Sequence, residues 1–314
     1  MIGKDIQKAK ALLENGELVA IPTETVYGLA GNALNENAVT EIFRVKERPS
    51  FDPLIIHTSS FSRIEQYAEV NQQAKILADE CMPGPLTLLL PKKAIISDLV
   101  TAGSNRVAVR IPAHPMSNEL LHELDFPLAA PSANPFGYIS PTTAQHVADQ
   151  LGEKIPYILD GGPAQVGLES TIVGFEQGLP TVYRKGGVPV ELIKEILGDV
   201  QVKAHSTSNP SAPGMLKSHY APRVPVKIGY DLSILKKHDP TKVGTIRFKT
   251  QLDGIPEKNQ LILSPSGDFA EAARNLFAGM RQLDSLDLEI ILAELVPEQD
   301  LGLAINDRLR RAAG

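Results

Sequence analysis

The sequence predicts an α/β protein built of two domains. Its 314 residues are enough for two domains that each bury a core. Apolar runs typical of buried strands alternate with segments of helical periodicity along most of the chain. Between residues 203 and 224 this alternation stops and Ser, Asn, Pro, Ala and Gly dominate, which indicates a linker. We therefore expect a first domain at 1–202, a linker at 203–224 and a smaller second domain at 225–314.

Short apolar runs bounded by turn-forming residues predict the strands of the first domain. They lie at 18–21, 54–57, 86–91, 107–112, the start of 126–135, 155–159, 169–174 and 181–187. Apolar residues at helical spacing predict helices at 5–15, 37–46, 61–80 and 189–197. One more helix is expected to begin with Ser140 as N-cap and Pro141 at the first helical position.

The second domain reads as a small parallel sheet with helical connections. Strands are expected near 225–230, 242–247, 260–264 and 289–295, and helices near 268–284 and 303–312. Strands that alternate with helices in this way are typical of parallel α/β domains.

Composition narrows the class of protein. A hydrophobic content of 43% and a charged content of 22% are ordinary for a globular protein. The net charge of -6 argues against a nucleic-acid coat but leaves room for a local basic cleft. A single cysteine, Cys81, excludes an intramolecular disulfide and a thiolate zinc cluster. No apolar run reaches the ~20 residues that span a bilayer, and the first residues lack a signal-peptide pattern, so we expect a cytoplasmic protein without membrane contact.

Two features indicate an anion site. Arg106 and Arg110 are four residues apart in a predicted strand, so they share one face, and burying both is costly unless an anion meets them. The stretch 44–57 places cations at a helix end, breaks the helix with two prolines, and enters a strand that ends in His57. It could hold phosphate or be an ordinary solvated helix end. Likewise Thr23, in a loop after a buried strand, could serve function or simply form a turn.

Several familiar catalytic motifs are absent from the sequence. There is no G-x-x-x-x-G-K-[ST] and no G-x-G-x-x-G, and the seven histidines form no H-E-x-x-H pattern. No G-x-S-x-G elbow supports a serine hydrolase. What remains is a scattered set of cations and hydroxyls, which suits a ligand with a polyphosphate and a carboxylate. The set comprises Lys46, Arg48, Arg106, Arg110, Arg184, Ser132, Ser140 and Ser170.

Six groups of residues resemble, in their order along the chain, the motifs of YrdC-like domains. Lys46-Glu47-Arg48-Pro49 with Pro53-Leu54 is similar to the K-x-R-P-x-x-x-P-L signature of that family. The others are Thr23-Glu24-Thr25-Val26-Tyr27-Gly28-Leu29, Pro131-Ser132-Ala133-Asn134, Glu169-Ser170-Thr171, Arg184-Lys185-Gly186, and the linker run Pro213-Gly214-Met215 with His219-Tyr220-Ala221-Pro222. Together they cover the chain and resemble the long two-domain form of the threonylcarbamoyl-AMP synthase family.

The resemblance implies both a fold and a reaction. The fold would be a YrdC-like twisted open-sheet α/β domain followed by a smaller Rossmann-like α/β domain, with the linker lying over the active site. The reaction would convert L-threonine, bicarbonate and ATP, with Mg²⁺, into threonylcarbamoyl-AMP and pyrophosphate. The implied partners are a downstream threonylcarbamoyl transferase and, through a weak contact, transfer RNA. The protein itself would supply no metal site.

The resemblance also implies roles for individual residues. The L-threonine contacts would be Thr23, His57, Arg110, Ala130 and Ser170, with Arg110 meeting the carboxylate. The ATP contacts would be Lys46, Ser50, Arg106, Ser132, Asn134, Ser140, Arg184 and Tyr220, and Lys46 and Arg48 would be catalytic. The chain departs from the family at Asp52, where asparagine is frequent, and at Leu216-Lys217-Ser218, which replaces Lys-Tyr-Arg.

Two other functions remain open at this point. A YrdC-like domain could be an RNA-binding module without adenylate-forming activity, and its affinity would then depend strongly on salt. A carbamoyl-phosphate-using maturation enzyme shares the domain, but the zinc-finger and acylphosphatase-like parts of such enzymes are missing from this sequence.

Overall fold

The computed structural model describes residues 1–203, 219–229 and 237–314, and these form two compact units. The N-terminal unit comprises Met1–Phe136, Ser140–Gln165 and Glu169–Leu216, and the C-terminal unit comprises Gly137–Ile139, Val166–Leu168 and Lys217–Gly314. Most of the predicted linker, 204–218, lies outside the described residues. Its placement over a site therefore stays a prediction.

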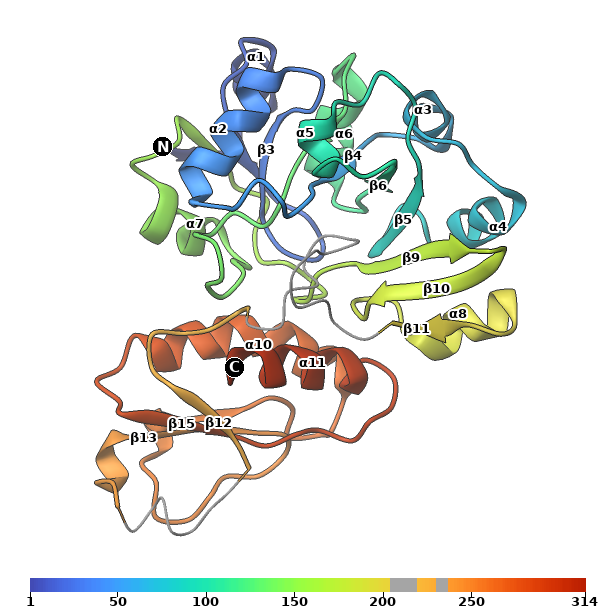
Figure 1. Cartoon of the computed structure of the whole chain (residues 1–314). Helices are drawn as coiled ribbons and strands as arrows, with labels where there is room; N and C mark the ends of the chain where they lie inside the picture. The colour runs from blue at the N-terminus through green and yellow to red at the C-terminus, as the bar shows by residue number, and fades with distance from the viewer. Residues whose placement is uncertain (204–218, 230–236) are drawn as a thin grey trace. The chain divides into compact units, whose positions relative to one another are not determined.

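The described part of the N-terminal unit forms an 11-stranded mixed sheet with the order β1-β8-β2-β3-β7-β4-β6-β5-β9-β10-β11. The strands are β1 (Ile2–Gly3), β2 (Val19–Ile21), β3 (Gly28–Asn32), β4 (Ile55–His57), β5 (Leu86–Pro91), β6 (Arg106–Arg110), β7 (Leu128–Ala129), β8 (Tyr157–Leu159), β9 (Thr171–Glu176), β10 (Leu179–Arg184) and β11 (Gln201–Val202). β6 pairs parallel with β4 and antiparallel with β5, while β9 and β10, both predicted as strands, pair antiparallel with each other. Figure 1 shows this sheet with helices around it.

Several helices of this unit begin with a polar side chain that caps them. They are α1 (Ile6–Glu14), α2 (Glu36–Lys46), α3 (Phe61–Tyr67), α4 (Gln72–Cys81), α5 (Asp98–Thr101), α6 (Pro115–Glu123), α7 (Ala144–Leu151) and α8 (Val190–Leu197). Asp5 accepts from the Lys8 amide at the start of α1, and Asn35 accepts from two amides at the start of α2. The C-cap of α2, Glu47, is left-handed with φ 55°, which turns the chain out of the helix.

Two helix predictions were wrong in their bounds, and two helices, the four-residue α5 and the longer α6, were not predicted. The expected helix 61–80 is broken at Ala68, which is extended, and Asn71 caps the new helix α4 by accepting from the Ala74 amide. The helix expected at Ser140 begins at Ala144, because Thr143 provides the cap by accepting from the His146 amide. Sequence reasoning missed α6, which starts with Pro115 in its first turn.

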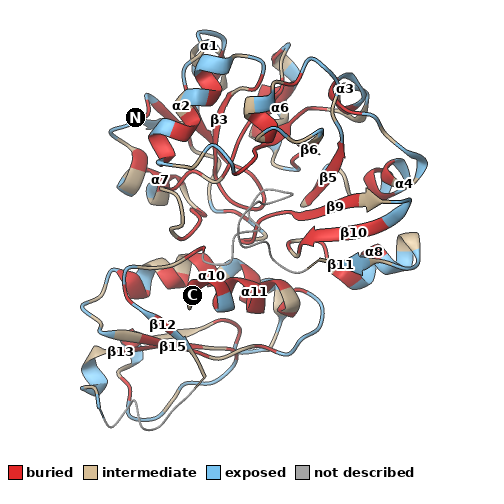
Figure 2. Cartoon of the chain, viewed as in Figure 1, coloured by how far each residue is buried: buried red, intermediate tan, exposed pale blue. Residues whose placement is uncertain are grey.

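The sheet of the N-terminal unit separates two cores by the period-two alternation of its strands. In β2, Ala20 joins a large core on one face, while Val19 and Ile21 join a smaller core with Leu13 and Leu120. The large core extends along the sheet as far as β10, and Figure 2 shows β5 and β9 buried for most of their length. The smaller core covers only the part of the second face near β8, β2, β3 and β7. Further along, that face carries a third cluster of only five buried residues, Ile55, Leu89, Ala108, Ile172 and Tyr183.

The C-terminal unit contains a four-stranded sheet in which each described pairing is parallel, in the order β12-β15-β13-β14. Its strands are β12 (Val226–Ile228), β13 (Val243–Arg247), β14 (Gln260–Ile262) and β15 (Ile290–Ala293). Helices α10 (Phe269–Asp284) and α11 (Gly302–Ala312) lie together on one face of the sheet, and short 3-10 turns η1 (Pro240–Lys242) and η2 (Glu257–Asn259) precede β13 and β14. The predicted α/β class, with a larger twisted sheet and a smaller parallel domain, is confirmed. Among the described residues, no helix is long and apolar enough to cross a membrane.

Candidate active site

One half of the N-terminal sheet has a polar face. The large core takes Ile56, Leu88 and Val109 from β4, β5 and β6, so the neighbouring residue in each strand points to the opposite face. Those neighbours are His57, Thr87 and Arg110. Arg106 shares this face with Arg110, since Ala108 between them belongs to the small cluster there. The prediction that both arginines share one face is therefore confirmed.

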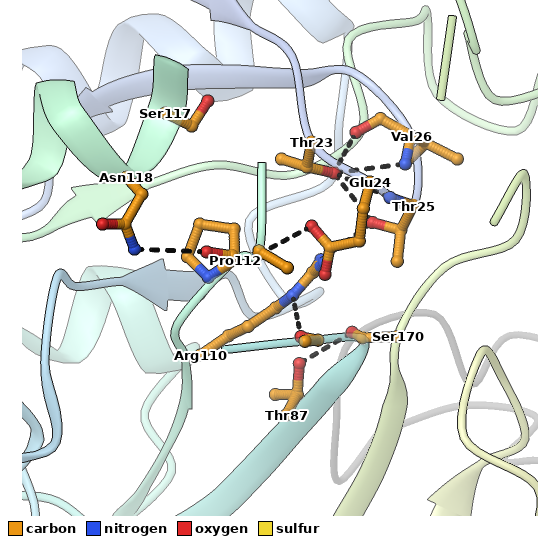
Figure 3. Close-up of polar contacts among 12 residues, drawn as sticks. Thr23, Glu24, Thr25, Val26, Thr87, Arg110, Pro112, Ser117, Asn118 and Ser170 are labelled. Carbon is orange, nitrogen blue, oxygen red and sulfur yellow. Dashed lines mark hydrogen bonds and ion pairs between the residues drawn. The ribbon is translucent and has the colours of Figure 1, made fainter. Parts of the chain in front are cut away.

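Arg110 is held at the centre of this face by three groups (Figure 3). Its Nη2 donates to Glu24 Oε1 at 2.6 Å, its Nη1 to Thr25 Oγ1 at 2.9 Å, and its Nε to the Gly84 carbonyl at 3.2 Å. Thr23 completes the group: its Oγ1 lies 2.8 Å from Thr25 Oγ1 and donates to the Val26 carbonyl. We call Thr23, Glu24, Thr25 and Arg110 the Arg110 corner.

The anion that offsets the burial of Arg110 is a group of the protein itself, the Glu24 carboxylate. Arg110 and Glu24 are both buried, at 4% and 8% exposure, and a buried pair is stable only when further hydrogen bonds satisfy both partners. Glu24 Oε2 accepts from the Ala113 amide at 3.0 Å, so both of its oxygens are used. A guanidinium has five N–H donors, and the described residues occupy three of those of Arg110. Two donors remain for a ligand.

A β-bulge directs Arg184 to the same face. Val182 pairs with Val173 and faces the large core, but Arg184 pairs with Ile172 of the small cluster, because the register shifts between Val182 and Arg184. The Arg184 guanidinium then donates to Ser170 twice, from Nε to the carbonyl at 3.0 Å and from Nη2 to Oγ at 3.0 Å.

Ser170 links Arg184 to the adjacent strand. Its Oγ lies 2.7 Å from Thr87 Oγ1 (Figure 3), and the side chain is buried. Gly186 keeps the following turn close: a Cβ there would lie 2.3 Å from the Glu169 carbonyl oxygen. Only glycine therefore allows the chain after Arg184 to pass over Ser170.

His57 is neutral at physiological pH. Burial, then Arg110, and to a smaller extent Arg184 lower its pKa from the usual 6.5 to about 3. It is paired in register with Arg110 across β4 and β6. The polar face thus combines two fixed guanidinium groups with an uncharged imidazole.

Lys46, at the last position of α2, ties a loop to the sheet. Its Nζ donates to the carbonyls of Ser132 and Asn134, both at 2.5 Å, and the Phe136 amide donates to the Lys46 carbonyl. Burial, and then the charge of Arg48, lower the pKa of Lys46 well below its usual value. The same loop is bound to β3, where the Leu29 amide donates to the Pro131 carbonyl at 2.7 Å.

Arg48 contacts its own loop. It donates to the carbonyls of Asp52 and Pro53, and its Nη2 lies 2.8 Å from Asp52 Oδ2. Asp52, which departs from the frequent asparagine of the family, is fully buried against Arg48. Ser50, between them, is exposed.

Three other predicted contact residues of this unit, Arg106, Ser140 and Ala130, each contact a different part of the chain. Arg106 donates from Nη1 to Tyr183 Oη at 2.6 Å and lies 3.9 Å from Glu176. Ser140 Oγ donates to Glu169 Oε1 at 2.5 Å. The Ala130 amide donates to the Ile55 carbonyl, and the Cβ of Ala130 lies 3.2 Å from where a side chain at Gly28 would begin.

Tyr220 belongs to the C-terminal unit and is buried there. Its ring centroid lies 5.4 Å from that of Phe277, and the Arg311 guanidinium lies 4.6 Å from the ring. Its predicted contact with ATP stays a prediction.

Two family models together match most of the chain. A family model described as "Telomere recombination" matches residues 11–186, and one described as "Threonylcarbamoyl-AMP synthase, C-terminal domain" matches residues 188–314. The threonylcarbamoyl-AMP synthase of Pyrococcus abyssi is 41% identical over 98% of this chain and 94% of the relative. That of Bacillus subtilis is 38% identical over 98% of this chain and 93% of the relative.

The chain belongs to the threonylcarbamoyl-AMP synthase family. A crystal structure of P. abyssi Sua5 complexed with L-threonine superposes with a TM-score of 0.92 at 39% identity, covering 100% of this chain and 97% of the other. The family resemblance read from the sequence motifs is thereby confirmed, including its long two-domain form.

The structure brings several of the predicted site residues into contact, in three groups. Thr23 and Arg110 meet in the Arg110 corner, Ser170 meets Arg184, and Lys46 meets Ser132 and Asn134. Sequence reasoning assigned no role to Glu24, Thr25, Thr87 or Glu169. Glu24 could have been found, because a strand arginine that needs an anion calls for a buried carboxylate, and Thr23-Glu24-Thr25 stands at the mouth of a neighbouring loop.

Proposed function

We propose that this chain makes threonylcarbamoyl-AMP and pyrophosphate from L-threonine, bicarbonate and ATP. The observation that supports this most is the Arg110 corner, where a buried guanidinium is fixed by Glu24, Thr25 and Gly84 yet keeps two donors. A guanidinium fixed in this way matches the planar geometry of a carboxylate. The crystal structure of the P. abyssi relative, which contains L-threonine, supports an amino acid as the ligand.

The threonine would bind over the polar face. Its carboxylate would take the two remaining donors of Arg110, and Thr23, Ala130 and Ser170 would surround the rest of the molecule. Neutral His57 suits this position, because a positive charge added to those of Arg110 and Arg184 would repel the ammonium group of threonine.

The reaction would need positioning rather than a protein nucleophile. The threonine amine and bicarbonate form a carbamate with loss of water. A carbamate oxygen then attacks the α-phosphorus of ATP, a new O–P bond forms, and the bond to the β-phosphate oxygen breaks as pyrophosphate leaves with the electron pair. Fixed cations stabilise the charge that develops in such a transfer. Arg184 and Arg106 on the sheet would be the cations in this role, together with Lys46 at the loop. The hydroxyls of Ser132 and Ser140 would contact the same ligand.

We propose that Mg²⁺ arrives bound to the triphosphate. The part of the chain that the structure describes brings together no three His, Cys, Asp or Glu side chains that could hold a metal ion. Mg²⁺ is commonly held by substrate phosphates and water with few protein ligands. When bound, the ion would offset negative charge on the phosphate oxygens.

The product would serve transfer RNA modification in the cytoplasm. A carbamoyl adenylate is an activated mixed anhydride, so we propose that a downstream threonylcarbamoyl transferase consumes it to form threonylcarbamoyl-adenosine. We propose only a weak direct contact with transfer RNA, because the net charge of -6 disfavours binding over the whole surface.

The test is mass spectrometry of the product from ATP, ¹³C-bicarbonate and isotopically labelled threonine. We expect one species that carries AMP, the ¹³C label and the threonine label, formed together with pyrophosphate. Omitting either bicarbonate or threonine should abolish it. Release of pyrophosphate without incorporation of threonine would contradict the proposal. Salt-sensitive binding of transfer RNA with no such product would instead favour an RNA-binding module.

A further inference from the structure

The C-terminal unit has a cavity of its own at the carboxyl ends of the strands of its parallel sheet. Its volume is about 570 Å³, within the range of roughly 300–1,000 Å³ typical of small-molecule sites. Three segments line it: 248–250 directly after β13, 294–297 directly after β15, and 267–269 where α10 begins. Because β13, β14 and β15 run parallel, their carboxyl ends lie at the same end of the sheet, and all three segments follow them.

The order of the strands reverses direction where this cavity lies. The chain passes from β13 to β14 on one side of β13, and then returns through α10 to β15 on the other side of β13. The direction of winding therefore reverses between β13 and β15. Ligands of open parallel α/β sheets bind outside the carboxyl ends of the strands at such a reversal.

Two aromatic rings form one wall of the cavity. Phe248 and Phe269 stack with their ring centroids 5.3 Å apart and an interplanar angle of 27°. Phe248 is buried, so its position is fixed by the unit. A planar base packs well against such a wall, because stacking on aromatic side chains is favourable for every base.

A cation lies beside this wall. A Cβ at Gly267 would lie 2.4 Å from Lys249 Nζ, so the lysine crosses this turn only because residue 267 is glycine. Gly267 also has φ +82°, a conformation that favours glycine. Apart from the ring of Phe248, 5.7 Å away, the Lys249 ammonium has no partner among the described residues. It lies where α10 begins, a position that favours a bound anion.

The carboxylate of Glu294 lines the third side of the cavity. Glu294, directly after β15, uses Oε2 to accept from the Phe248 amide at 3.0 Å, and Arg247 Nε lies 3.3 Å from the same oxygen. Within the described chain Oε1 of Glu294 has no hydrogen bond. An acidic residue at the end of a parallel strand is the group that binds ribose hydroxyls in nucleotide-binding α/β folds.

We propose that the C-terminal unit binds a mononucleotide in this cavity, at a site separate from the polar face of the N-terminal unit. The base packs against Phe248 and Phe269, the ribose hydroxyls donate to Glu294, and the phosphate meets Lys249 over Gly267. This binding is additional to adenylate formation and does not depend on it.

The test is hydrogen–deuterium exchange mass spectrometry of the full chain titrated with AMP. We expect AMP to protect peptides covering 247–252, 264–270 and 294–300. Lys249→Gln should raise the apparent Kd at these peptides about tenfold, since it removes one charge-assisted contact. Lys249 is exposed, so the variant should fold normally. Lys258→Gln, which changes an exposed lysine of the same unit outside this cavity, is the matched control and should leave the Kd unchanged.

Three outcomes would overturn the proposal. Protection confined to peptides of the N-terminal unit would place AMP at the polar face alone, which would leave the proposed enzyme activity intact. An unchanged Kd in Lys249→Gln would remove the phosphate contact. Equal protection by inorganic phosphate or by adenosine, each titrated alone, would exclude a nucleotide as the ligand.

Discussion

The Arg110 corner and the Lys46 loop (residues 46–53) both bury cations in the N-terminal unit, but different groups hold them. Arg110 is fixed mainly by side chains, Glu24 and Thr25, that come from a separate loop. Lys46 and Arg48 donate chiefly to backbone carbonyls, those of Ser132 and Asn134 for the lysine and those of their own loop for the arginine. The first arrangement fixes a guanidinium and leaves two of its donors without a partner among the described residues. The second fixes the course of the chain.

This difference predicts different roles for Arg110 on the one hand and for Lys46 and Arg48 on the other, although the sequence alone presents all three as site cations. A cation satisfied by carbonyls stabilises a loop, so replacing it should affect stability as well as ligand binding. A guanidinium with donors to spare should affect one ligand specifically. The predictions below test that distinction, beginning with the largest expected effect.

Arg110→Ala should cause the largest loss. If two charged hydrogen bonds to threonine disappear, at about 1.5–3 kcal/mol each, kcat/KM for threonine should fall roughly 10²–10⁴-fold. Steady-state kinetics with varied threonine measure this, with Arg110→Lys as the variant that keeps the charge. Removing one partner also leaves Glu24 buried without its cation, so thermal unfolding should show a destabilisation of about 3–5 kcal/mol. A folded Arg110→Ala variant with kcat/KM within tenfold of the original would show that Arg110 does not bind the carboxylate.

Lys46→Met should destabilise the N-terminal unit by about 2–4 kcal/mol. Methionine fills the buried space but removes the two hydrogen bonds that Lys46 donates to the Ser132 and Asn134 carbonyls, and such hydrogen bonds contribute about 1–2 kcal/mol each. Urea unfolding measures the loss. We also expect the KM for ATP to rise much more than the KM for threonine, and the same for Arg48→Ala. Equal changes in both KM values would mean that the Lys46 loop does not serve the nucleotide.

Acid should destabilise the protein through His57. Its pKa is about 3 in the folded chain and about 6.5 when unfolded, so below pH 6.5 only the unfolded state takes up the proton. The stability contributed above pH 6.5 is therefore lost as the pH falls toward 3, by about 2 kcal/mol between pH 6.5 and pH 5. Urea midpoints at several pH values measure this. His57→Asn should show a shallower pH dependence by one proton, and parallel curves for both proteins would contradict the assignment.

Local pattern in the sequence was enough to predict most strands of the sheet and part of the site, although β1, β3 and β11 were not predicted. The alternation in 107–112 predicted that Arg106 and Arg110 share a face, and the structure confirms it. The break between α3 and α4 was missed because apolar residues at helical spacing continue across it, while the signal for a new helix is a single capping residue, Asn71 at the start of α4.

Longer-range features of the site could not be read from pattern. Alternation alone would send Arg184 into the large core with Val182, and only the bulge against β9 turns it toward Ser170. The pairing of Arg110 with Glu24 joins residues 86 positions apart, and it depends on the packing of a loop against β6. Such contacts follow from tertiary packing, which local propensity does not encode.

Glu24→Gln should produce the smallest effect and sharpen the comparison most. The amide oxygen can still accept from Arg110, but the charge is lost and the amide nitrogen cannot accept from Ala113, so the guanidinium should be held less firmly. A loss of about 1 kcal/mol predicts a KM for threonine raised roughly fivefold, with kcat and the KM for ATP little changed. Glu17→Gln, at an exposed position, is the matched control. If both KM values rose together, Glu24 would support the whole unit rather than position Arg110 for one substrate.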